Sequence, residues 1–294
     1  MRDLSSKSCS ARTCQSGESG VVGNLPQWLD TVVGNVKIER KSKQELALMR
    51  QAGRIVANVL DAIREKARPG VSTGELDALA EEVITREQAV PAFKGYPHTG
   101  YNDFPASICA SINQEIVHGI PSPRRVLKEG DLISIDVGAV YKGFYGDAAI
   151  TLPIGKVDEE ARRLLEVTER ALMAGIRQAY EGNRLWNLIQ AIESSVETAG
   201  FQVLREYQGH GIGRAMHEKP DIPNFLGPHG RRPKNYPLLS GMTLALEPMV
   251  VAGDWHTTVL DDGWTVVTAD GKRSAHFEHT LAITNGEAEI LTRL

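Results

Sequence analysis

The sequence predicts an α+β fold in which antiparallel strands form the middle of the molecule and helices pack outside them. Two observations support this class. One order of elements, two helices followed by strands that carry acidic residues, occurs twice along the chain. Glycine-containing turn signals also separate neighbouring strand-like runs. We therefore expect two similar halves related by a pseudo-twofold axis.

The start of the chain differs from the rest in composition. It is rich in Ser and Gly and contains few large apolar residues. This favours a flexible extension over residues 1–36, followed by one folded domain over residues 37–294. The alternatives for the extension are an organelle transit peptide, which Asp3 and Glu18 argue against, and a docking segment around Leu25–Leu29.

Two helices are predicted at the start of the first half. Ser42 and Glu45 have the spacing of a capping box, and apolar residues follow at helical intervals until Pro69-Gly70. Ser72 and Glu75 repeat the capping signature at the start of a second helix. Each helix is expected to turn one apolar face towards the core.

Strand-like runs follow these helices, at residues 106–113, 132–141 and 144–152. The turn Lys142-Gly143 separates the last two runs, which indicates a hairpin. Alternation along the second run places Asp136 on a face with the small residues Ser134 and Gly138, which leaves room for a ligand. Asp147 would face Asp136 if the hairpin closes.

The second half repeats the order of elements. Helices are predicted at about residues 158–180 and 184–199, and strands at 202–207 and 242–251. Three dipeptides that end in glycine each signal a hairpin turn: Asp262-Gly263, Asp270-Gly271 and Asn285-Gly286.

Five residues with metal-binding side chains lie in these strands and turns: Asp136, Asp147, His210, Glu247 and Glu278. Four carboxylates and one imidazole supply enough oxygen and nitrogen donors for two divalent ions, with positions left open for water. Such a site suits hydrolysis. The pseudo-twofold would place the two aspartates opposite the two glutamates.

These residues also have structural interpretations. Asp136, taken alone, is more typical of a hydrogen-bonded structural acid. His210 lies among three glycines, which allow a close backbone approach to a ligand but also occur in plain turns. Glu247 interrupts an apolar run, where a metal or an arginine partner would compensate its burial. Glu278 lies inside a late strand-like run over residues 276–280, in which either His276 or His279 is compatible with a surface position.

Composition excludes several classes of protein. The net charge of −4 argues against a general nucleic-acid-binding surface, although Arg231-Arg232 leaves a local basic patch open. Three cysteines are too few for a disulfide framework, which favours a reducing compartment. No apolar run approaches the ~20 residues of a membrane span, and a secretory signal is missing. We expect a soluble, cytoplasmic monomer without membrane or specific nucleic-acid partners.

Over residues 40–294 the chain resembles the type I methionine aminopeptidases. The resemblance rests on dispersed strings in the family's order: Ile112-Asn113, Val117-His118-Gly119-Ile120-Pro121, Asp136-Val137-Gly138, Gly146-Asp147, Gly209-His210-Gly211-Ile212-Gly213, Met216-His217-Glu218-Lys219-Pro220, Leu246-Glu247-Pro248-Met249 and Phe277-Glu278-His279-Thr280. It implies a pita-bread fold and removal of the initiator methionine from nascent chains, chiefly when the second residue is small. The ribosome is a further expected contact.

The resemblance also implies a role for each predicted ligand. Asp136 would chelate one ion, His210 and Glu247 would bind the other, and Asp147 and Glu278 would bridge both. The ions would be two divalent cations of cobalt, manganese, iron or zinc. A water bridging them would supply the hydroxide that attacks the first peptide carbonyl.

Further residues are implied to contact the substrate. His118 would lie near the scissile amide, His217 would stabilise the oxyanion and Glu247 would shuttle the proton to the leaving amine. The expected methionine pocket comprises Tyr101, Phe104, Cys109, Met216 and Trp264. His98 and Met216 depart from the usual residues at these positions, which puts the pocket rim in question. The structural alternative for all of them is ordinary core packing.

Two other functions are compatible with the sequence. Prolidases and aminopeptidase P-like enzymes share the fold but usually carry a further N-terminal domain, for which residues 1–36 are too short. A non-catalytic pita-bread binding module is the other alternative. The presence of all five predicted ligands argues against that module.

Overall fold

The computed structural model describes residues 38–228 and 232–293, so the predicted extension at 1–36 lies outside the described residues. The described part contains helices α1 Lys43–Lys66, α2 Thr73–Arg86, α3 Glu159–Ile176 and α4 Leu185–Glu197. Its strands are β1 Val90–Pro91, β2 Ile108–Ile112, β3 Glu115–Val117, β4 Leu132–Tyr141, β5 Phe144–Pro153, β6 Gln202–Val203, β7 Gln208–Gly211, β8 Glu218–Pro223, β9 Thr243–Leu246, β10 Met249–Val251, β11 Thr257–Val259, β12 Val266–Thr268, β13 Ser274–His276, β14 His279–Ala282 and β15 Glu289–Ile290.

The first helix pair begins as the sequence predicts. The Ser42 side chain accepts a hydrogen bond from the backbone of Glu45, whose carboxylate accepts one from the backbone of Ser42. Ser72 and Glu75 make the same capping box at α2. Both helices pack on the sheet of the first half through buried aliphatic side chains, and α1 lies along β4 and β5.

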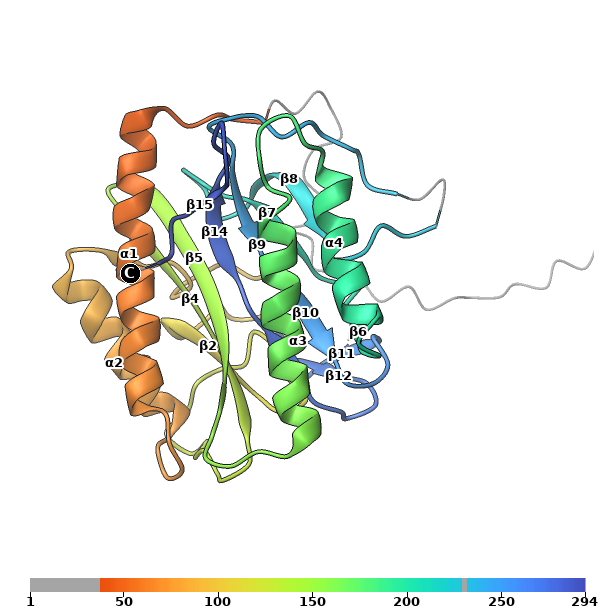
Figure 1. Ribbon diagram of the computed structural model, residues 1–294. Helices are drawn as coiled ribbons and strands as arrows, with labels where there is room; N and C mark the ends of the chain where they lie inside the picture. Colours follow the sequence, from red (N-terminus) through yellow and green to blue (C-terminus); the bar gives the residue numbers. More distant parts are fainter. Residues whose placement is uncertain (1–37, 229–231, 294) are drawn as a thin grey trace, which may run out of the picture. The chain divides into compact units, whose positions relative to one another are not determined.

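The helices of the second half cover a different set of strands. α3 and α4 pack against each other, and α3 contacts β9, β10 and β13. Figure 1 shows the orange helices α1 and α2 over one half and the green helices α3 and α4 over the other. Each half therefore consists of a helix pair on antiparallel strands, which confirms the predicted α+β class and its pita-bread arrangement.

The described strands form four antiparallel sheets. β5, β4 and β2 are joined side by side, and β1 pairs with the β4 end. The five-stranded sheet has the order β15-β14-β9-β7-β8. Two three-stranded sheets have the orders β13-β10-β6 and β11-β12-β3. Among the described residues no helix combines the length and apolar character that crossing a lipid bilayer requires.

The hairpin predictions were partly wrong. Asp262-Gly263 joins the paired strands β11 and β12, and Asn285-Gly286 joins the paired strands β14 and β15, as expected. Asp270-Gly271 lies between β12 and β13, which belong to different sheets. This dipeptide therefore makes a turn without forming a hairpin.

Two strands predicted as continuous are each interrupted. The run 242–251 divides into β9 and β10 at Glu247-Pro248, and the run around Glu278 divides into β13 and β14 at Phe277-Glu278. β9 pairs with β14 in the five-stranded sheet, whereas β10 pairs with β13 in a three-stranded sheet. The chain thus changes sheets at two adjacent places. We call these two dipeptides the sheet crossings.

A threonine joins the two halves beside the crossings. The Thr280 hydroxyl in β14 donates to the backbone oxygen of Asp147 in β5 at 2.7 Å and accepts from the Asp147 N–H at 3.0 Å. The backbone N–H of Glu278 donates to the Ala149 oxygen at 2.8 Å. These bonds fix the position of Asp147 relative to Glu278.

Candidate metal centre

The two aspartates lie on one face of a closed hairpin. Lys142 and Gly143 both have positive φ, +49° and +80°, which matches the tight turn between β4 and β5. Asp147 is directly opposite Gly138, and Gly138 lies two residues after Asp136 on the same strand. Residues at these positions point to the same side of a sheet. The predicted pairing of the two acids is therefore present.

The two glutamates lie at the sheet crossings and not inside strands. Glu247 follows β9, and Glu278 precedes β14, the strand paired with β9. Their carboxylates can therefore face the aspartates without occupying a place in a regular ladder. His210 comes from β7, where its backbone pairs with that of Ala245 in β9.

The side chains of the five predicted ligands lie close together in one cluster. His210 Nε2 lies 3.5 Å from Glu247 Oε1 and 3.9 Å from Asp147 Oδ2. Donor atoms of Asp147, His210 and Glu278 all lie within 4.8 Å of one another. Asp136 contacts Asp147 through their carboxyl groups. The structure thus gathers all five residues predicted as ligands.

In the described part of the chain, these acids lie together without a Lys or Arg partner. Burial raises the pKa of Asp136 to about 7. Burial, reinforced by the neighbouring carboxylates, raises the pKa of Asp147, Glu247 and Glu278 well above the usual range. None of the four forms an ion pair with Lys or Arg among the described residues, so the arginine partner considered for Glu247 is not found there.

Three carboxylate oxygens in the cluster lack hydrogen-bond partners in the described part of the chain. Asp136 Oδ1, Asp147 Oδ1 and Glu278 Oε1 are buried without a hydrogen-bond partner in the described part of the chain. Leaving such atoms unpaired is costly. Divalent cations would satisfy these oxygens and offset the mutual repulsion of the carboxylates, so the donor set fits the predicted metals.

A hydrogen bond to the backbone fixes the tautomer of His210. Its Nδ1 lies 2.8 Å from the Gly211 carbonyl oxygen, which can only accept, so Nδ1 carries the hydrogen. Burial lowers the pKa of His210 to about 4 and keeps the ring neutral near pH 7. Nε2 therefore presents a lone pair to the carboxylate cluster, the tautomer that metal binding requires.

Two further histidines were predicted to contact the substrate. The His217 ring centroid lies 4.4 Å from that of His210, and His217 is an exposed residue. His118 has a positive φ of +60°, an uncommon conformation for a residue other than glycine. Its ring contacts those of Tyr207 and Trp264 at centroid distances of 5.9 and 6.1 Å.

Most of the predicted methionine pocket forms one apolar cluster beside the acids. Phe104, Cys109, Met216 and Trp264 are buried and pack together. Cys109 in β2 is the register partner of Asp136, so the predicted pocket residues adjoin a predicted ligand. Burial, followed by the nearby Asp136 and Asp147, raises the pKa of the Cys109 thiol, which keeps it a neutral, apolar side chain.

Tyr101 differs from the rest of this cluster because its side chain is 54% exposed. Its ring contacts His98 at a centroid distance of 5.1 Å, and His98 contacts Trp264 at 4.7 Å. His98 and Tyr101 thus form an aromatic rim over Trp264.

Sequence reasoning missed two residues. The Tyr96 hydroxyl lies 2.8 Å from His217 Nδ1, and nothing in the sequence around Tyr96 signals this contact. His276, which could have been a surface residue, is only 1% exposed and lies within the carboxylate cluster. A signal existed for His276, because it precedes Glu278 by two residues and extended chains point such side chains to one face.

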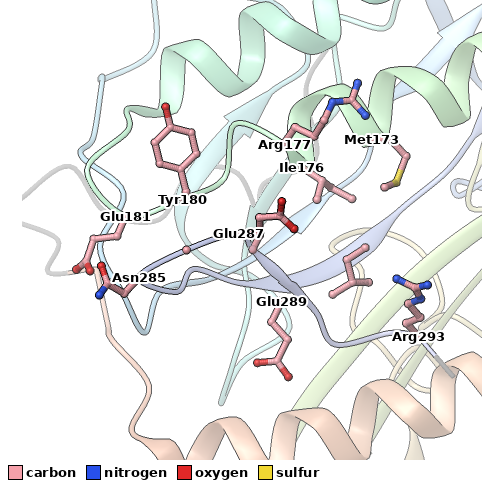
Figure 2. Close-up of a pocket in the computed structure, with 12 residues that line it drawn as sticks. Met173, Ile176, Arg177, Tyr180, Glu181, Asn285, Glu287, Glu289 and Arg293 are labelled. Atoms are coloured by element: carbon pink, nitrogen blue, oxygen red, sulfur yellow. The ribbon is translucent and has the colours of Figure 1, made fainter.

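A cavity elsewhere in the molecule contains none of the predicted residues. It has a volume of about 740 Å³ and lies between the end of α3 and the β14–β15 hairpin. Figure 2 shows its lining, which includes Arg177 and Arg293 together with the acidic residues Glu181, Glu287 and Glu289. Its surroundings lack the convergent donors of the carboxylate cluster, so we base no function on it.

Comparison with known proteins gives one family. Residues 47–285 match metallopeptidase family M24. The chain is 50% identical over 254 residues to methionine aminopeptidase 1 of Bacillus subtilis (strain 168), an alignment that covers 86% of this chain and 98% of the relative. It is 47% identical over 265 residues to methionine aminopeptidase 1 of Mycobacterium tuberculosis (strain CDC 1551 / Oshkosh), covering 88% and 96%.

Solved structures with a similar fold include another methionine aminopeptidase. A methionine aminopeptidase from Thermotoga maritima superposes with a TM-score of 0.83 at 44% identity and covers 88% of this chain and all of that one. A prolidase from Pyrococcus furiosus has a TM-score of 0.67 at 22% identity, covering 87% of this chain and 65% of the prolidase. The second likeness shows the shared fold alone.

Proposed function

Because this chain belongs to the methionine aminopeptidases of metallopeptidase family M24, we propose that its carboxylate–histidine cluster removes the initiator methionine from nascent polypeptides whose second residue is small. The observation that carries the proposal is the convergence of buried, unpaired carboxylate oxygens on the neutral His210. The enzyme is a metal-dependent hydrolase, and the non-catalytic alternative is set aside.

The proposed ligands divide between two divalent cations. Asp136 would hold one cation, His210 and Glu247 would hold the other, and Asp147 and Glu278 would contribute oxygens to both. Cobalt, manganese, iron and zinc all suit oxygen-rich sites that include imidazole. Such cations would lower the pKa of a coordinated water towards ~7 and polarise the scissile carbonyl.

The protein's own groups supply the remaining steps. Glu247, one of the acids of the cluster, would take a proton from the attacking water and return it to the leaving amine. His217, an exposed residue next to His210, would donate a hydrogen bond to the developing oxyanion. His118 contacts the substrate near the scissile amide, where the backbone strain at its positive φ helps to fix the ring.

Specificity for methionine rests on the apolar pocket. Phe104, Cys109, Met216 and Trp264 form an apolar cluster next to Asp136, and burying a thioether side chain against it would be worth ~1.5–3 kcal/mol. Met216 lies against Gly138 of β4, where a larger residue would not fit. The His98–Tyr101 rim contacts the residue after the methionine in this proposal. The enzyme would act as a cytoplasmic monomer on chains emerging from the ribosome.

Product analysis on defined peptides tests the function. We expect the chelator-treated protein to regain methionine release from Met-Ala peptides when cobalt, manganese, iron or zinc is restored. Release from Met-Lys peptides should be far slower, and Ala-Pro peptides should stay intact. Cleavage of Ala-Pro in preference to Met-Ala would support a prolidase-like enzyme, and no hydrolysis with any metal would contradict the proposal.

A further inference from the structure

His276 lies beside the carboxylate cluster but has no role in the function proposed above. It is the last residue of β13, immediately before the second sheet crossing, and its backbone pairs with Met249 of β10. Its side chain is 1% exposed. Its Nε2 atom is buried and has no hydrogen-bond partner among the described residues. Buried polar atoms in native proteins nearly always have a hydrogen-bond partner, so an unpartnered ring nitrogen needs an explanation.

The nearest atoms to this nitrogen are two carboxylate oxygens. Nε2 lies 3.7 Å from Glu247 Oε2 and 3.9 Å from Glu278 Oε2. Both distances exceed those of a hydrogen bond. They are close to the separation of two ligands that share one cation, since donors ~2.1 Å from a tetrahedral ion lie ~3.4 Å apart. Donor atoms of His276, Glu247 and Glu278 all lie within 4.8 Å of one another.

The surroundings of His276 repeat those of His210 on the other side of Glu247. His210 Nε2 faces Oε1 of Glu247 at 3.5 Å, whereas His276 Nε2 faces Oε2. Each imidazole also approaches one further acid, Asp147 for His210 and Glu278 for His276. The cluster therefore offers two imidazole nitrogens, one for each oxygen of a shared carboxylate.

We propose that His276 is a metal ligand and that, with Glu247 and Glu278, it holds a cation next to the position of His210. The inference rests on the metal centre proposed above and adds a second nitrogen donor to it. An additional imidazole favours cobalt and zinc over manganese, because nitrogen donors bind the later divalent metals more strongly. Metal selectivity is thus the property that His276 sets.

Proton NMR of the cobalt-loaded protein tests this without any substitution. Each histidine bound to paramagnetic Co²⁺ gives one strongly shifted imidazole N–H resonance that disappears in D₂O. We expect two such resonances in the unmodified protein, from His210 and His276. A single resonance in a protein that binds two cobalt ions would overturn the inference and leave the proposed function standing.

A substitution identifies the second resonance. His276→Gln keeps a side-chain N–H that can hydrogen-bond to Glu247 but offers a poor ligand to transition metals. The variant should lose one shifted resonance and bind Co²⁺ at least about tenfold more weakly in calorimetric titration. Its affinity for Mn²⁺ should fall less.

His279→Gln is the matched control. His279 belongs to the same segment, but its Nδ1 lies 2.9 Å from the Thr292 hydroxyl and its ring is outside both donor groups. This variant should keep both resonances and the cobalt affinity. Unchanged cobalt binding in His276→Gln would show that His276 only packs beside the acids. An unmodified protein that binds no cobalt and releases no methionine would instead refute the proposed function.

Discussion

At the scale of single residues, a hydrogen bond from Tyr96 determines what His217 can do. Desolvation by the surrounding protein, followed by the neighbouring His210 and His118, lowers the pKa of His217, so the ring is neutral near pH 7. A neutral imidazole has one N–H. If the Tyr96 hydroxyl donates to Nδ1, the hydrogen must reside on Nε2, the nitrogen that can then donate to an oxyanion.

We expect Tyr96→Phe to lower kcat about tenfold, because a hydrogen bond of this kind is worth ~1–1.5 kcal/mol. Steady-state kinetics with Met-Ala peptides should show a nearly unchanged KM, and metal analysis should show unchanged metal content. Tyr180→Phe, at a tyrosine that is 42% exposed, provides the control. A variant with the kcat of the unmodified protein would show that Tyr96 does not orient His217.

At the scale of elements, the helices and the first hairpin follow from local signals. Both capping boxes and the Lys142-Gly143 turn depend on residues close together in sequence, so their positions could be predicted. The positions of the sheet crossings could not be predicted in this way. Residue alternation indicates an extended chain, but it does not reveal which neighbour each segment pairs with.

Two of the predicted ligands lie where strand pairing could not be predicted from the sequence. Glu247 and Glu278 were assigned to the interiors of strands, whereas they lie at the crossings, where backbone pairing is interrupted. Their identity as candidate ligands could be inferred from the strings that contain them. Their proximity to His276 depends on the pairing of β10 with β13, which no local pattern specifies.

The Thr280 hydroxyl leads to a prediction about the contact between the halves. It satisfies both the N–H and the carbonyl oxygen of Asp147 and is fully buried. Thr280→Val keeps the shape but leaves both backbone groups unpaired, so the free energy of unfolding should fall by roughly 1–3 kcal/mol. Urea titration measures this loss, and calorimetry should show weaker metal binding.

Thr258→Val, on the exposed strand β11, is the control for Thr280. It should change stability by no more than about 0.5 kcal/mol. Equal effects of the two substitutions would mean that the Thr280 bonds do not hold Asp147 in place.

At the scale of the whole molecule, the acids make stability depend on pH when metal is removed. Burial raises the pKa of Asp136 to about 7 and, reinforced by the neighbouring carboxylates, raises those of Asp147, Glu247 and Glu278 well above their unfolded values near 4. The folded metal-free protein therefore binds more protons than the unfolded chain near neutral pH. Its free energy of unfolding must fall as pH rises through these folded pKa values.

The buried histidines act in the opposite direction but over a lower range. The lowered pKa values of His118, His210 and His276 reduce stability wherever the unfolded chain takes up protons and the folded protein does not. The unfolded rings are about half protonated at pH ~6.5, so this effect is lost only by about pH 7.5. Above that pH the rings are neutral in both states and no longer act against the carboxylates.

We expect the four acids to lower the melting temperature of the chelator-treated protein as pH rises from 6.5 to 8.5. Asp136 alone accounts for roughly 1 kcal/mol, or ~3 °C, of this loss, and the histidines act against it up to about pH 7.5. Scanning calorimetry of the unmodified protein and Glu278→Gln at several pH values separates the two contributions, because the histidines are the same in both. The unmodified protein should lose more melting temperature than the variant over this interval, and the same pH dependence in both would contradict the assigned pKa shifts.

The donors of the centre come from both halves of the chain, with Asp136 and Asp147 on one hairpin and the remaining ligands on the strands and crossings of the other half. A cation that these donors share acts as a reversible cross-link between distant segments, and its binding energy adds to the stability of the folded state. Metal starvation would therefore do more than stop turnover. It would also leave the polypeptide open to proteolysis, so that the supply of the ion controls the lifetime of the enzyme in the cell.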